Sequence, residues 1–154
     1  MKNAIIIAAL SLGFGSAFAQ KVKEADVPVV VKESFAKKYP GIKAEKWEKE
    51  GVEYEAEFDM KKVETSASFD ASGIFLQSEV EIKVADLPKA VFDYVTKNLA
   101  GEKIKEASKI TDAKGTVMYE AEVGEADYIF DSNGSFLKKE VETEKDDDDK
   151  KEKK

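Results

Sequence analysis

Two rows of glutamates are the side chains of this sequence whose types and spacing could do chemistry. The rows are Glu53, Glu55 and Glu57, and then Glu120 and Glu122. Each row alternates with apolar residues, as in Tyr54-Glu-Ala-Glu-Phe58, and such alternation is typical of a half-buried strand. The carboxylates of each row should share one face, where they could draw a basic partner or a hard cation such as Ca²⁺. Alternate acids are also typical of a plain solvated face, so both interpretations stay open.

A pair of these carboxylates could in principle hydrolyse a glycoside, which requires one carboxyl group with a selectively raised pKa. Nothing in the sequence raises the pKa of one glutamate above the others. The chain also has no His and no Cys, which removes the usual general base, the Ser–His and Cys–His pairs and cysteine-ligated zinc. We therefore expect a protein that is not an enzyme, with no catalytic residues, no defined metal site and no cofactor.

The charge balance narrows the class of partner. The formal net charge is -7, so the surface should repel nucleic acid and anionic lipid. Every basic residue is Lys, and without Arg the chain cannot clamp a phosphate or carboxylate through two parallel hydrogen bonds. We expect no nucleic acid among the partners.

Residues 1–19 have the pattern of a signal peptide. Lys2 is followed by an apolar run from Ala4 to Leu12, and Ala17-Phe18-Ala19 is a small-x-small cleavage site before Gln20. The apolar run is far shorter than the roughly 20 residues needed to span a bilayer. We predict export to the periplasm or the cell exterior, with no membrane attachment after cleavage.

The elements that must position the glutamates are duplicated. Asp26-Val27-Pro28 is typical of a helix start, with Asp26 as the N-cap, and Ala85-Asp86-Leu87-Pro88 repeats it 60 residues later. After each opening an apolar residue recurs every four positions. The two stripes are Val27, Val31, Phe35 and Tyr39, and Leu87, Val91, Val95 and Leu99. These stripes predict two helices, each with one apolar face.

Four strands should follow each helix, with Phe-Asp-x-x-Gly turns that end at Gly73 and Gly134. The predicted fold is α+β, with two tandem helix-plus-four-strand repeats at about 25–82 and 85–141. They would form one antiparallel eight-stranded sheet with both helices on one face, within a domain spanning 20–141. The opposite face would be open. Residues 142–154, including the run Asp146 to Lys150, should form a disordered charged tail.

These repeated motifs resemble the PepSY-like family of small exported proteins, which is common in Bacteroidetes and is described as having a beta-lactamase-inhibitor-like fold. The motifs are the Asp-Val-Pro and Asp-Leu-Pro helix openings, the two Tyr-Glu-Ala-Glu strands and the two Phe-Asp-x-x-Gly turns. The resemblance covers Ala25 to about Val141. It implies tandem helix-plus-four-strand units and a concave sheet face available for docking, and it implies no catalytic residues.

Three aromatic residues are candidate anchors on the open face. Trp47 is the only Trp and lies among charged residues, and Phe75 and Phe136 each follow a turn at equivalent positions. Strand alternation would direct both Phe side chains to the open face. The alternatives are that Trp47 packs at the sheet margin, and that a bulge shifts the register at the two Phe residues or that they cover hairpin corners.

Together these observations predict a non-enzymatic exported binding module. Its partner would be another exported protein or peptide, bound or inhibited through the open face, and a monomer is favoured. The predicted contact residues are Trp47, Phe75, Phe136, Glu53, Glu55, Glu57, Glu120 and Glu122. The alternative is an acidic envelope or matrix component that responds to Ca²⁺ through its glutamate rows.

Overall fold

The computed structural model describes residues 19–141, which form one antiparallel sheet and two α-helices. The sheet has nine strands in sequence order from β1 to β9. Its elements are β1 (Ala19–Val22), the 3-10 helix η1 (Glu24–Asp26), α1 (Val29–Lys38), β2 (Lys46–Glu50), β3 (Glu53–Met60), β4 (Val63–Asp70), β5 (Phe75–Glu81), η2 (Val84–Asp86), α2 (Lys89–Asn98), β6 (Ile104–Asp112), β7 (Val117–Val123), β8 (Ala126–Asp131) and β9 (Phe136–Val141).

The prediction of eight strands was wrong because the chain forms a further edge strand before the first repeat. β1 pairs antiparallel with β2, from Ala19 opposite Glu50 to Val22 opposite Trp47. The expected cleavage point before Gln20 falls inside this strand. The rest of the predicted signal peptide and the predicted tail at 142–154 lie outside the described residues. No helix in the described part of the chain is long and apolar enough to cross a membrane.

Both α-helices begin two residues later than Asp26 and Asp86 suggested. Each aspartate ends a 3-10 helix, and a proline, Pro28 or Pro88, takes the N-cap position without a side-chain cap. The Pro28 carbonyl accepts hydrogen bonds from the N–H groups of Val31 at 3.0 Å and Lys32 at 3.2 Å. The fixed φ of proline therefore starts the first turn, and the predicted Asp26 N-cap was wrong.

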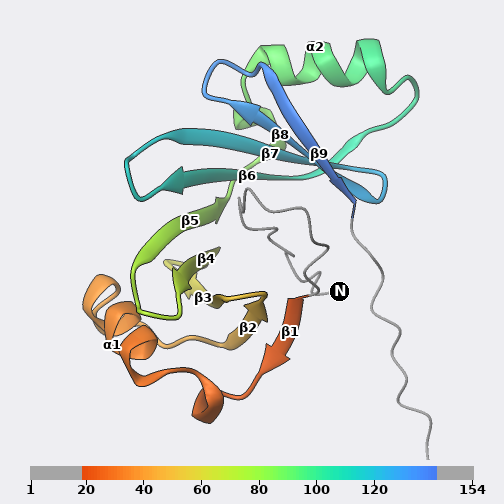
Figure 1. The fold of residues 1–154 in the computed structure, drawn as a ribbon. Coiled ribbons are helices and arrows are strands. Elements are labelled where there is room, and N and C mark those ends of the chain that lie inside the picture. Colours follow the sequence, from red (N-terminus) through yellow and green to blue (C-terminus); the bar gives the residue numbers. More distant parts are fainter. Residues whose placement is uncertain (1–18, 142–154) are drawn as a thin grey trace, which may run out of the picture.

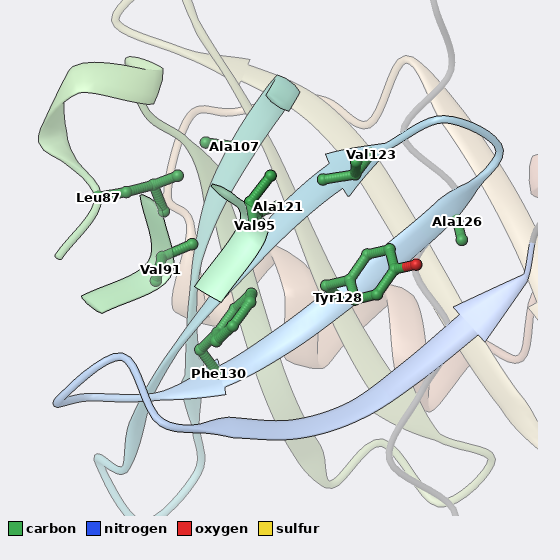
Figure 2. Close-up of a cluster of buried hydrophobic side chains, with 9 residues drawn as sticks. All are labelled: Leu87, Val91, Val95, Ala107, Ala121, Val123, Ala126, Tyr128 and Phe130. Atoms are coloured by element: carbon green, nitrogen blue, oxygen red, sulfur yellow. The ribbon is translucent and has the colours of Figure 1, made fainter. Parts of the chain in front are cut away.

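The two predicted apolar stripes build two separate cores. α1 buries Val31 and Phe35, and α2 buries Val91 and Val95. The core under α1 consists of Val27, Val31, Phe35, Trp47, Ala56, Phe58, Ala67 and Phe69. The core under α2 consists of Leu87, Val91, Val95, Ala107, Ala121, Val123, Ala126, Tyr128 and Phe130, shown in Figure 2. The apolar sides of the two Tyr-Glu-Ala-Glu strands thus pack under the helices as predicted.

Figure 1 shows α1 beside β2–β4 and α2 above β6–β9, with the sheet bending between the two groups of strands around β5. The ladder is continuous through that bend, because β5 pairs with β6 from Gln77 opposite Asp112 to Glu81 opposite Ser108. α1 packs on the first group of strands and α2 on the second.

Three tight turns share one design, in which an aspartate accepts two backbone hydrogen bonds. The Asp70 Oδ1 atom accepts from the N–H groups of Ser72 and Ile74, both at 2.9 Å. Asp112 and Asp131 repeat the pattern. The Ser72 hydroxyl and then the Ile74 N–H group hold the pKa of Asp70 below its usual value, and the backbone N–H groups of Thr116 and Ser135 do the same for Asp112 and Asp131. Two of the turns were predicted, and the one at Asp112 was missed because no Phe precedes it.

Gly73 is required both for its backbone conformation and for space. Its φ is +84°, and an added Cβ would lie 2.8 Å from the Val30 carbonyl oxygen and the Ser34 Oγ atom. Gly41 has a similar φ of +80° with nothing within 4 Å, so it is a matched control. Gly73→Ala is expected to lower the free energy of unfolding by about 2 kcal/mol, and Gly41→Ala by about 1 kcal/mol. Equal losses in urea denaturation would contradict the close approach of turn and helix.

Candidate functional site

The strand side chains that point away from the two apolar cores are polar, and many of them are buried. Cross-strand partners share a face, so the register runs from Glu55 through Ser68 to Gln77, and from Ser66 through Glu79 to Ile110. We call this surface the acidic face. Its buried polar residues are Glu48, Glu55, Ser66, Ser68, Gln77, Glu79, Ser108, Glu120 and Asp127. The expectation of an open solvated face was therefore wrong for Glu55 and Glu120.

Three carboxyl groups form the centre of the acidic face. Glu55 on β3 is 8% exposed, Glu79 on β5 is 2% exposed and Glu120 on β7 is 7% exposed. Glu79 is the neighbour that the other two share, because its charge acts on both of them. We call these residues the carboxyl trio.

Burial raises the pKa of Glu55 well above its usual range, and the charge of Glu79 adds to the rise. Burial also raises the pKa of Glu120, and Glu79 and Asp127 add to it. For Glu79, burial raises the pKa to about 7, while the Ser108 hydroxyl and the Glu120 carboxyl lower it. Glu140 and Glu64 raise the pKa of Glu79 further. At pH 7 the Glu79 carboxyl is therefore close to the midpoint of its ionisation.

Several carboxyl oxygens of the trio lack a well-placed hydrogen-bond donor. Within the described residues, the Glu55 Oε1 atom and both Oε atoms of Glu79 are buried without a partner in normal hydrogen-bond geometry, although Ser108 and Glu120 lie close enough to affect Glu79. The other oxygen of Glu55 accepts a long bond of 3.4 Å from the Ser68 hydroxyl. Buried acceptors without donors are uncommon in folded proteins, so this centre is the candidate site.

Lysines neutralise acids closer to the edge of the acidic face. Lys46 lies 2.7 Å from Glu57 and 3.1 Å from Glu48, and Lys105 lies 2.8 Å from Glu122. Lys138 pairs with Glu140. Glu57 and Glu122, which the sequence placed in the binding rows, are therefore held in ion pairs. Glu53 is half-buried at the strand end, where burial and then the charge of Asp70 raise its pKa.

The predicted position of Trp47 on the open face was wrong. Trp47 is 4% exposed and packs in the α1 core, with its ring centroid 5.6 Å from that of Phe35. The strand alternates around it, so Lys46 and Glu48 occupy the acidic face and Trp47 lies opposite Ala56 on the helix side. Partner binding by Trp47 stays a prediction without support from its position.

Phe75 and Phe136 also turn away from the acidic face. The register shifts between Ser68 and Phe69 and again between Ile129 and Phe130, so each Phe pairs with a core residue. Phe75 packs on Phe69 with the Lys38 ammonium 3.7 Å from its ring centroid. Phe136 stacks on Tyr94 at 4.8 Å and keeps 39% exposure. The alternative of a register-shifting bulge is thus the correct one, and the predicted aromatic patch on the open face was wrong.

The sequence reading missed Glu79 although its signal was present. Gln77, Glu79 and Glu81 alternate along β5 as the two predicted glutamate rows do. β5 lacks the Tyr-Glu-Ala-Glu motif that marks β3 and β7. Among residues 19–141, no group of three or more Asp, Glu, His or Cys is arranged to hold a metal ion.

The family model described as "Putative beta-lactamase-inhibitor-like, PepSY-like" matches residues 17–76 and 59–138. The chain therefore belongs to this family. A search of curated proteins finds no significant match.

Solved structures from Bacteroides share the fold. A DUF2874 family protein from Bacteroides uniformis is 19% identical with a TM-score of 0.64, covering 74% of this chain and 88% of its own. A BLIP-like protein from Bacteroides fragilis is 24% identical with a TM-score of 0.58, covering 77% and 88%. A Bacteroides eggerthii structure described among "putative periplasmic proteins" is 19% identical with a TM-score of 0.61, covering 75% and 88%.

Proposed function

We propose that this protein is a non-enzymatic binding module of the periplasm or cell exterior, which docks another exported protein or peptide on its acidic face. The observation that carries the proposal is the carboxyl trio, whose buried oxygens include three without a hydrogen-bond donor among the described residues. A bound partner would supply those donors. Its solved relatives include a protein described as periplasmic and one described as BLIP-like, in agreement with an exported binding role.

The two-repeat frame supports the same proposal. We infer that each helix and its four following strands are copies of one unit, with both helices on the same face. Residues opposite one another share a face, and the register runs from Phe58 under α1 through Thr65, Val80 and Lys109 to Tyr119 beside α2. Both helices then cover the convex side, and the concave side is left to a partner.

An enzymatic role for the trio is disfavoured by its electrostatics. A carboxylate pair that acts as acid and base needs one group kept protonated and the other kept ionised. Burial raises the pKa of Glu55, Glu79 and Glu120, so none of the three has a lowered pKa that would keep it ionised as the base. The same raised values suit a site that becomes fully charged when a cation enters it.

Photo-crosslinking tests which face binds. A benzophenone amino acid at Glu64 or Glu140 would report on the edge of the acidic face, and one at Val29 on α1 would report on the helix side. In envelope extract from the source bacterium, the first two positions are expected to crosslink one common exported protein, and Val29 is not. Crosslinking of that protein through Val29 alone, or of none through Glu64 and Glu140, would refute the proposed docking face.

A further inference from the structure

We propose that the acidic face contains a receptor for one cationic side chain with an aliphatic stem, a lysine or an arginine presented by the exported partner. The carboxyl trio would receive the charged group, and a small apolar cluster beside it would receive the stem. This inference rests on the proposed function and specifies the chemistry of the partner.

The carboxyl oxygens at the charged end of the receptor can accept hydrogen bonds from a bound cationic group. Glu55, Glu79 and Glu120 are each more than nine-tenths buried, and three of their oxygens have no donor in normal hydrogen-bond geometry within the described part of the chain. An acceptor left buried without a donor costs about 1–3 kcal/mol. A lysine ammonium group carries three N–H donors and a positive charge. One such group can therefore satisfy several of these oxygens at once.

The apolar end of the receptor is the cluster of Ile110, Met118 and Ile129, which is buried on the same face. Ile110 lies opposite Glu79 in the ladder between β5 and β6, and Ile129 lies opposite Glu120 between β7 and β8. Met118 lies opposite Ile110. Carboxyl groups and apolar side chains are thus direct cross-strand neighbours. A long cationic side chain matches this arrangement, because it has an apolar stem and a charged end.

This mixed surface favours an organic cation over a metal ion. Ca²⁺ takes six to eight oxygen ligands, which apolar side chains cannot supply. No group of three or more acids among residues 19–141 has that arrangement. A lysine stem, by contrast, would bury its methylene groups on Ile110, Met118 and Ile129 while its ammonium group reaches the trio.

Short peptides of uncharged residues with one variable position test this chemistry. The probes carry lysine, acetyl-lysine or diaminopropionic acid, which keeps the charge of lysine on a shorter stem. Binding to the ¹⁵N-labelled processed protein is measured by chemical-shift titration at pH 8 and low salt. The lysine peptide is expected to bind at least about tenfold more tightly than the acetyl-lysine peptide. The diaminopropionic acid peptide should bind more weakly than lysine, because it cannot span both ends of the receptor.

Variants locate the receptor. Glu79→Gln is expected to weaken binding of the lysine peptide by about tenfold or more, since it removes the central charge. Glu81→Gln is the matched control, because Glu81 lies two residues further along β5 on the same face and is exposed. It should change the affinity by less than about twofold. The melting temperature of both variants is measured, so that loss of binding through unfolding is recognised.

Four results would overturn the receptor. They are equal binding of the lysine and acetyl-lysine peptides, equal weakening by Glu79→Gln and Glu81→Gln, equal binding of the long and short amines, and displacement of the lysine peptide by Ca²⁺ at millimolar concentration with the same shifts. Any of them, together with crosslinking through Glu64 and Glu140, would leave the docking face standing without the lysine chemistry. Failure of the crosslinks would instead refute the docking face itself.

Discussion

Phe130→Ala is expected to lower the free energy of unfolding by about 4 kcal/mol, because a large aromatic side chain is removed from a core that cannot collapse around the space. Phe130 is fully buried under α2, and its ring centroid lies 5.3 Å from that of Tyr94 and 6.0 Å from that of Phe136. It belongs to the second core, which Figure 2 shows. A loss of this size is a large part of the stability of a small domain.

The same variant tests whether the two halves unfold together. Trp47 is the only Trp in the chain and lies in the first core, so its fluorescence reports on the half that Phe130→Ala leaves intact. The ladder between β5 and β6 joins the halves, and the Ile82 N–H group donates to the Ala107 carbonyl at 2.9 Å across the connection. We therefore expect the midpoint by Trp47 fluorescence to fall as far as the midpoint by far-UV circular dichroism.

Phe136→Ala is the matched control, since Phe136 stacks on Tyr94 but keeps 39% exposure. Its loss should be about 1 kcal/mol, because less buried surface is removed. A Trp47 midpoint that stays at the wild-type position in Phe130→Ala would show two independently unfolding units and contradict a single cooperative domain.

Sequence periodicity predicted the helix side of this fold well and the acidic side poorly. Residues four positions apart lie on the same face of a helix. The recurrence of an apolar residue at every fourth position therefore predicted the burial of Val31, Phe35, Val91 and Val95. The alternation of apolar and acidic residues along β3 likewise placed Ala56 and Phe58 on the side of the core. Alternation assigns residues to faces, however, and says nothing about how far a sheet curves. Whether Glu55 and Glu120 meet water therefore depended on a bend that no local pattern encodes.

The aromatic residues show a second limit. One register shift at Phe69 and another at Phe130 reverse the direction of Phe75 and Phe136 relative to strict alternation. A bulge inserts a single residue, so its exact place depends on the packing of both strands and the adjacent helix. β1 escaped prediction for a related reason. The segment from Gln20 to Val22 has too few residues for a periodic pattern, and its pairing with β2 is a tertiary contact.

The acidic face carries the second large effect, a pH dependence of stability. Glu79→Gln is expected to raise the free energy of unfolding at pH 8 by roughly 3 kcal/mol, since burial raises the pKa of Glu79 from 4.5 to about 7 and each pKa unit corresponds to about 1.4 kcal/mol. The neutral amide replaces a carboxylate that the fold disfavours. The nearby carboxyls of Glu140 and Glu64 act in the same sense through their negative charge.

The direction of this pH dependence follows from the raised pKa of Glu79. A carboxyl with a raised folded pKa contributes its full stability below the unfolded value of 4.5, and this contribution is lost as the pH rises through about 7. The wild-type protein should therefore be more stable at pH 5 than at pH 8, and Glu79→Gln should flatten that slope in urea denaturation at each pH.

Asp131→Asn is the control of opposite sign, because backbone N–H groups lower the pKa of Asp131 and its charge stabilises the fold at neutral pH. A wild-type protein that gains stability between pH 5 and pH 8, or a Glu79→Gln variant that loses it at pH 8, would show that the buried trio is already neutralised within the fold. The free receptor would then have no unmet charge to offer a lysine, so this measurement also tests the electrostatic premise of the proposed binding site.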